Sequence, residues 1–316
     1  MGLARLCCAA LLMPPLASCS SRLLAPATSR LAPWTTQLRD QQPEDATAAV
    51  YRRGQALLIF VGAVHENQTN SATFQMIRDA YAGFHIDVVI AEGYPTTKGP
   101  NPPRLMEYAE EEVRSGFQEG GESVPTIAGA IKEGAQVWGG EPDDTDITSR
   151  VMAEGFSPAD LLGYYALRVV PQWIREGKIN DAGDPRLRAL VDLELRRGRS
   201  ALKLETAVLP NFNSWASWYQ SLNGKPIGAD FTTEEVGPLQ DGSFGSNMIA
   251  AAVSRARDAF LHELIIKHLQ EGKAVLVVFG GSHLAIQRPA FDAVLGRPCY
   301  AGGNLDEAPV RCGGRN

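Results

Sequence analysis

Two short apolar runs, far apart in the chain, most constrain the fold. Residues 56–61 read Ala-Leu-Leu-Ile-Phe-Val, and residues 274–279 read Ala-Val-Leu-Val-Val-Phe, without polar positions in alternation. Such uninterrupted runs are typical of strands that are buried on both faces of a parallel sheet. Each run leads directly into the same pattern, Gly-x-x-His, at 62–65 and at 280–283. The sequence therefore predicts a sheet covered on both faces, with a histidine just beyond two of its strands.

The segments between these runs alternate between helix and strand patterns. A helix over 71–84 and a buried strand over 86–91 complete a strand–helix–strand unit with the first run. Further helices are indicated at 102–115, 126–133 and 246–271, a third strand at 135–138, and a short helix with an edge segment after residue 279. Residues 150–240 have predominantly helical patterns. We predict one α/β domain over 47–316, with a largely parallel sheet, helices on both faces and a helical insertion in the middle.

The N-terminus has the pattern of a lipoprotein signal. Arg5 precedes a short apolar run over 6–16, which falls short of the roughly 20 residues that span a bilayer. The run ends in Leu-Ala-Ser-Cys19, which resembles a bacterial lipobox, so we expect residues 1–18 to be removed and Cys19 to be lipidated. An ordinary signal peptide followed by a chance cysteine is the alternative. Residues 19–46 are rich in Ser, Ala, Pro, Thr and Gln and are expected to form a flexible tether.

This interpretation places the domain in the cell envelope, facing the periplasm and attached to a membrane by its N-terminal lipid. Ser20 after Cys19 is compatible with the outer membrane. Cys299 and Cys312 are then two thiols in an oxidising compartment, and we expect a disulfide, with two free thiols as the alternative. The net charge of −6 argues against a nucleic-acid partner. Nothing in the sequence indicates the oligomeric state.

His65, Glu92 and His283 are the principal candidate site residues. Ligands of α/β sheets bind beyond the carboxyl ends of the strands, where both histidines are expected, and Glu92 follows the strand over 86–91. Two imidazoles and a carboxylate can hold a divalent metal with an open position for water. Glu66, next to His65, is a candidate base. The alternative is that each Gly-x-x-His is a chance match whose histidine only makes a local hydrogen bond.

Other polar clusters carry weaker signals. Glu141 and the carboxylates that follow it up to Asp146 are expected at the same edge, as a ligand or base, although Asp and Thr also cap helices. His262 and His268 are six positions apart on a predicted helix, so their rings lie on different faces and we expect a solvated helix surface there. The chain contains no P-loop, no Gly-x-Ser-x-Gly and no Gly-x-Gly-x-x-Gly, so it lacks the common nucleotide and serine hydrolase motifs.

Taken together, the two Gly-x-x-His motifs and Glu92 resemble the superfamily that joins Tiki, TraB and GumN proteins, erythromycin esterases and ChaN haem-uptake lipoproteins. Arg257, on the helix before the second motif, matches an arginine that members tend to carry. Residues 61–76 and the lipoprotein signal look most like the ChaN branch. This chain lacks the second histidine that often follows the first motif in ChaN-like proteins, which favours metal over haem.

The resemblance implies hydrolysis of peptide or ester bonds in a small molecule or peptide. In that hypothesis His65, Glu92 and His283 hold zinc, manganese or cobalt, or activate water directly, and Arg257 stabilises developing negative charge. The alternative implied by the ChaN branch is a haem- or iron-binding lipoprotein without catalysis, in which Tyr94 or a histidine ligates the iron. A third hypothesis is a degenerate fold that serves as a surface binding module.

Overall fold

The computed structural model describes residues 24–96, 99–116 and 119–315. A six-stranded sheet has the order β4-β3-β5-β2-β1-β6. Its strands are β1 (Thr47–Arg53), β2 (Ala56–Ala63), β3 (Val88–Pro95), β4 (Gln136–Glu141), β5 (Ala274–Gly280) and β6 (Tyr300–Gly302). The four strands from β4 to β2 are parallel, whereas β1 is antiparallel to both of its neighbours. The predicted α/β class with a largely parallel sheet is confirmed.

Strand β1 was not predicted. It forms a hairpin with β2 in which Arg53 pairs with Ala56, and Gly54 supplies a left-handed backbone (φ +62°) at the turn. Residues 48–51 of β1 are fully buried. The two alanines among them have low strand propensity, so the pairing of β1 with β2 and β6 is decided by burial rather than by local preference.

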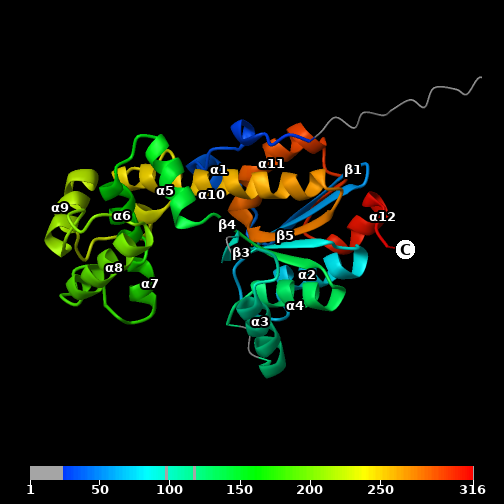
Figure 1. Cartoon of the computed structure of the whole chain (residues 1–316), viewed down its shortest axis with the longest axis horizontal. Helices are drawn as coiled ribbons and strands as arrows, with labels where there is room; N and C mark the ends of the chain where they lie inside the picture. Colours follow the sequence, from blue (N-terminus) through cyan, green and yellow to red (C-terminus); the bar gives the residue numbers. More distant parts are fainter. Residues whose placement is uncertain (1–23, 97–98, 117–118, 316) are drawn as a thin grey trace, which may run out of the picture.

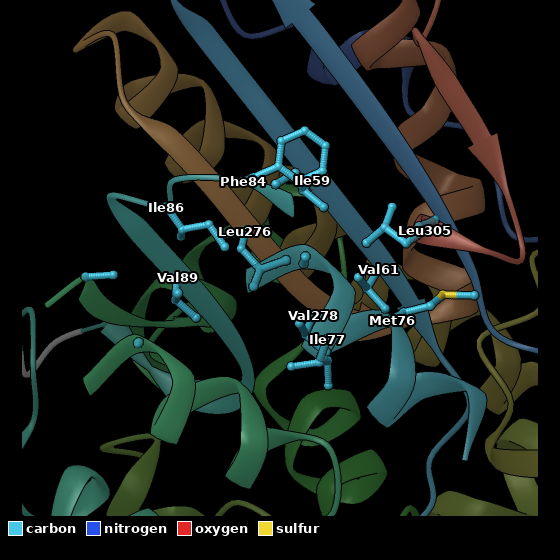
Figure 2. Packing of buried hydrophobic residues seen from close by; sticks show 14 of the residues in the cluster. Ile59, Val61, Met76, Ile77, Phe84, Ile86, Val89, Leu276, Val278 and Leu305 are labelled. Atoms are coloured by element: carbon cyan, nitrogen blue, oxygen red, sulfur yellow. The ribbon is translucent and has the colours of Figure 1, made fainter. Parts of the chain in front are cut away.

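Helices cover both faces of the sheet, as predicted (Figure 1). On one face lie α2 (Ala72–Gly83), α3 (Pro103–Ser115) and α4 (Ser123–Glu133), and on the other lie α10 (Gly245–Gln270) and α11 (Gly281–Leu295). Side chains alternate along the buried strands: Ile59 and Val61 pack toward α2, while Leu58 and Phe60 pack toward α10 and α11. Figure 2 shows the first of these cores.

The helical insertion has its own core beside the sheet. It contains α5 (Asp144–Ala153), α6 (Pro158–Leu167), α7 (Val170–Arg175), α8 (Leu187–Ala201), α9 (Phe212–Asn223) and the 3₁₀ turn η3 (Thr233–Val236). Trp215 and Tyr219 are fully buried there and pack with Ile249 and Val253 of α10. Helix α10 therefore joins the two parts, because its second half packs on the sheet (Figure 1).

The expected tether is wrong for residues 24–46. These residues include η1 (Thr28–Arg30) and α1 (Thr36–Asp40), and the segment lies beside α10 and α11 (Figure 1). Its backbone is held at several points: Ala32 N–H donates to Ile286 O (2.9 Å), and Gln240 N–H donates to Trp34 O (2.8 Å). The composition of this segment is typical of a solvated linker. Its backbone hydrogen bonds are made with residues far along the chain, which only the folded domain brings close. The predicted signal peptide and Cys19 lie outside the described residues.

The last elements described are η4 (Leu305–Glu307), which packs against α2, and α12 (Ala308–Cys312), which packs against β1. The predicted disulfide between Cys299 and Cys312 is confirmed, with Cα atoms 5.5 Å apart. Within the described ranges, no helix is long and apolar enough to cross a membrane.

Removing this disulfide is expected to lower the stability of the domain. In the chain-entropy model, a cross-link that closes a loop this short lowers the entropy of the unfolded chain. Removing it should lower the free energy of unfolding by about 3 kcal/mol. The Cys299→Ser/Cys312→Ser variant and the reduced wild type should therefore show equal losses of that size in urea unfolding. An unchanged midpoint in both would show that the cross-link does not constrain the unfolded chain.

Candidate functional site

The fold brings His65, Glu92 and His283 together at the carboxyl edge of the sheet. His65 lies in the loop after β2, Glu92 lies in β3, and His283 lies in the first turn of α11. Glu92 is between the two rings: its Oε2 is 4.0 Å from His65 Nε2, and its Oε1 is 3.6 Å from His283 Nε2. Residues separated by up to 218 positions in the sequence therefore share one carboxylate.

The two glycines of the motifs allow this close approach. Gly62 pairs with Phe279 rather than with Gly280, so β2 and β5 are offset by one residue and the two glycines face opposite sides of the sheet. A Cβ atom at Gly62 would lie 3.1 Å from a methyl carbon of Leu284 in α11. A Cβ atom at Gly280 would lie 3.0 Å from His65 Nε2. Gly62 therefore leaves room for Leu284, next to the second motif, and Gly280 leaves room for His65, the last residue of the first motif.

The two histidines have different environments despite their matched motifs. His283 is only 6% exposed, and its Nδ1 is 2.7 Å from Asp258 Oδ1. Burial alone would lower the pKa of His283, but the charge and hydrogen bond of Asp258 outweigh it and raise that pKa to about 10. At neutral pH His283 is therefore an imidazolium that neutralises Asp258 and faces Glu92.

His65, in contrast, has a side chain that is 64% exposed. Its Nδ1 lies 2.6 Å from Oε1 of Glu122, at the start of α4. This hydrogen bond raises the pKa of His65 above its usual value, although partial burial opposes the shift. Glu122 thus fixes the orientation of the ring through Nδ1, and Nε2 is directed to Glu92 and to solvent. The base of a catalytic dyad is oriented by a carboxylate in the same way.

Glu122 was not predicted as a site residue. It is 57 positions from His65 and belongs to no motif with it, so only the packing of α4 against α2 and β3 brings the two together. Glu66, the predicted base, is not in this arrangement. In the part of the chain that the structure describes, its side chain has no hydrogen bond or ion pair.

Arg257 and Glu141 complete the charge arrangement around Glu92. The guanidinium binds Glu141 through two contacts, Nε to Oε2 (2.7 Å) and Nη2 to Oε1 (2.5 Å), and its Nη2 is 3.3 Å from Glu92 Oε1. Burial alone would raise the pKa of Glu92, but His283, the Gly280 N–H (2.7 Å) and Arg257 lower it to about 2. Glu92 is therefore a fixed negative charge at all physiological pH values.

This arrangement does not fit a divalent metal well. The Arg257 guanidinium lies where a cation would meet the carboxylates of Glu92 and Glu141. His283 Nδ1 is engaged by Asp258, and the raised pKa of the ring favours a proton rather than a lone pair on Nε2. Among the residues that the structure describes, no three His, Cys, Asp or Glu side chains are placed to hold a metal ion. Arg257 therefore occupies the position beside these two carboxylates that a metal ion would take.

Tyr94, the expected haem ligand, lies near the end of β3, directly after Gly93, whose backbone is left-handed (φ +85°). It lines a cavity of about 400 Å³ together with Tyr108 and Leu105 of α3. Burial raises the pKa of its phenol.

His262 and His268 are buried, so the expected solvated surface is wrong. Their residues are 0% and 2% exposed. Helix α10 is covered by the sheet, by the insertion and by the N-terminal segment, and this leaves both histidines inside. His268 packs against the Trp138 ring, with centroids 5.2 Å apart.

Comparisons of this chain with protein-family models, with curated proteins and with solved structures gave no match.

The contact between Glu122 and His65 leads to a pH prediction. Because the carboxylate raises the pKa of His65, Glu122→Gln should lower that pKa. An NMR titration of the His65 Cε1–H resonance should show its midpoint moving to lower pH, and any activity that needs neutral His65 should extend to lower pH as well. His85, at the opposite edge of the sheet, serves as the internal reference. A His65 midpoint that stays in place, or rises, would contradict the pairing.

Proposed function

We infer that this chain is a lipid-anchored, extracytoplasmic hydrolase of ester or peptide bonds that activates water without a metal. One observation carries this proposal: the gap of 4.0 Å between His65 Nε2 and Glu92 Oε2. This distance is too long for a hydrogen bond but suits a water molecule bonded to both atoms. The His65 ring faces this gap with its only free nitrogen.

In the proposed reaction, His65 Nε2 takes a proton from the bridging water as the oxygen adds to the carbonyl carbon of the substrate. Glu122 stabilises the imidazolium that forms, because its carboxylate accepts a hydrogen bond from the Nδ1–H of His65. The tetrahedral intermediate then collapses. His65 returns the proton to the leaving alcohol or amine, which leaves a carboxylic acid as the second product.

The remaining residues prepare this step rather than react in it. Glu92 holds the water through Oε2, and its charge is balanced by His283 and Arg257. Helix α11 begins at Gly281, directly after the Gly280 N–H that binds Glu92, so its positive N-terminal end adds to the potential at this point. This potential and that of Arg257 favour the negative charge that develops on the carbonyl oxygen.

Lipidation of Cys19 would determine how the domain faces the membrane. Leu24 is five positions after Cys19, so the lipidated cysteine would lie at most about 18 Å from Leu24. The carbonyl of Leu24 accepts a hydrogen bond from Gln270, at the end of α10 that precedes β5. This is the edge of the sheet opposite His65, so the proposed site faces away from the membrane.

A substrate panel tests this function. Purified protein should hydrolyse members of a set of esters and peptides without added metal. Titration with haem, followed at the Soret band, distinguishes the ChaN-like alternative. Stoichiometric haem binding with no hydrolysis of any member would overturn the proposal.

A further inference from the structure

A chain of buried hydrogen bonds joins the N-terminal segment to His283. His262 and Gln287 are both fully buried, and Asp258 is 1% exposed. The contacts run from Ala27 N to His262 Nε2 (3.1 Å), from His262 Nδ1 to Gln287 Oε1 (3.0 Å), and from Gln287 Nε2 to Asp258 O (2.7 Å). Asp258 Oδ1 then binds His283 Nδ1 (2.7 Å).

The donors and acceptors of this chain allow one assignment of protons. Both atoms of Asp258 near Gln287 Nε2, its carbonyl oxygen and Oδ1 (3.4 Å), are acceptors, so the Gln287 amide must present its NH₂ group to them. Gln287 Oε1 then faces His262 Nδ1, which must carry a proton. His262 Nε2 is left with a lone pair and accepts the Ala27 N–H. Burial lowers the pKa of His262, which agrees with this neutral tautomer.

The N-terminal segment also covers Asp258. Leu31 and Trp34 of this segment line a cavity of about 450 Å³ whose wall includes Asp258 and Ser254 of α10. Ser254 Oγ donates to Asp258 Oδ2 (3.2 Å). Without the segment, this side of α10 would open to water, and the carboxylate that holds His283 would gain other partners.

We propose that docking of residues 24–34 positions His283 through His262, Gln287 and Asp258, so that the segment joining the domain to its anchor is a working part of the site. His262 and Gln287 are positioning residues, because neither touches the open gap beside His65. The inference rests on the proposed function for the role of His283. The hydrogen-bond chain itself can be measured without any substrate.

NMR of the full chain provides this measurement. The signal to follow is that of the His283 Nδ1–H, which donates a hydrogen bond to Asp258. Gln287→Met removes both amide contacts at similar volume, and Ala27→Pro removes the N–H that begins the chain. Each should shift or broaden the His283 proton signal and speed its exchange with water several-fold. On an active substrate, kcat should fall with little change in KM.

Ala32→Pro is the matched control. Like Ala27→Pro, it places a proline beside an existing proline and removes one backbone N–H. The N–H of Ala32 donates to Ile286 O, however, and not to His262. Ala32→Pro loosens the segment away from His262, so it should change the His283 signal much less than Ala27→Pro does. The proposal is overturned if Ala27→Pro and folded Gln287→Met leave the signal unchanged, or if Ala32→Pro changes it as much as Ala27→Pro does. A protein that hydrolyses nothing but shows the predicted shifts would contradict only the hydrolase function.

Discussion

His65→Ala is expected to reduce kcat about 10²- to 10⁴-fold, the contribution of a positioned general base. The reason is that His65 Nε2 is the one ring nitrogen of the site that faces solvent and has no hydrogen-bond partner among the described residues. The side chain is 64% exposed, but its removal leaves the Glu122 carboxylate, whose side chain is 9% exposed, without this hydrogen bond, so a loss of stability of about 1–3 kcal/mol should accompany the loss of rate. The rate should be measured on the best substrate of the panel, with thermal unfolding recorded for the same preparations.

His85→Ala is the matched control for this prediction. His85 is also an exposed histidine beside a carboxylate, with its side chain 69% exposed and Nε2 3.4 Å from Asp87 Oδ1, but it lies at the amino edge of the sheet. Its kcat should equal that of the wild type. A His65→Ala enzyme that keeps wild-type kcat would exclude His65 as the base.

Asp258→Ala is expected to destabilise the domain by about 3–5 kcal/mol, because it leaves the imidazolium of His283 buried without its partner. Urea unfolding at pH 6 measures this loss. Asp306→Ala, at an exposed position in η4, should change the free energy of unfolding by less than about 0.5 kcal/mol. Equal effects of the two substitutions would show that His283 is not held as a cation.

The same pair predicts how stability depends on pH. The pKa of His283 is raised from its unfolded value of 6.5 to about 10, so the stabilisation that its proton brings is complete below pH 6.5 and is lost as the pH rises through 10. Wild-type stability should therefore fall over this interval, whereas that of Asp258→Ala should fall less. Parallel curves for the two proteins would contradict the raised pKa.

The sequence was sufficient to predict much of the framework. Uninterrupted apolar runs identify β2 and β5 because only strands covered on both faces need them, and the residues after them must then meet at one edge. It could not show that the two motifs differ in role. The one-residue offset between β2 and β5, which sends Gly62 and Gly280 to opposite faces, depends on the packing of the whole sheet.

Residues outside recognisable motifs were not predicted, for related reasons. Glu122 reaches His65 only because α4 packs beside α2, and no local pattern marks that contact. The burial of His262 depends on the segment over 24–46, whose composition resembles that of a solvated linker. The composition of a segment indicates whether it can remain exposed to water. It does not indicate whether the folded domain offers hydrogen-bond partners for the backbone of that segment.

The central claim, that His65 and Glu92 activate water without a metal, is tested most directly by metal-stripped protein. After treatment with a strong chelator and dialysis, metal content should be measured together with the rate of hydrolysis. The account predicts full activity at metal contents far below one ion per chain. Loss of activity on stripping, restored by one equivalent of zinc, manganese or cobalt in the wild type but not in His65→Ala, would contradict it.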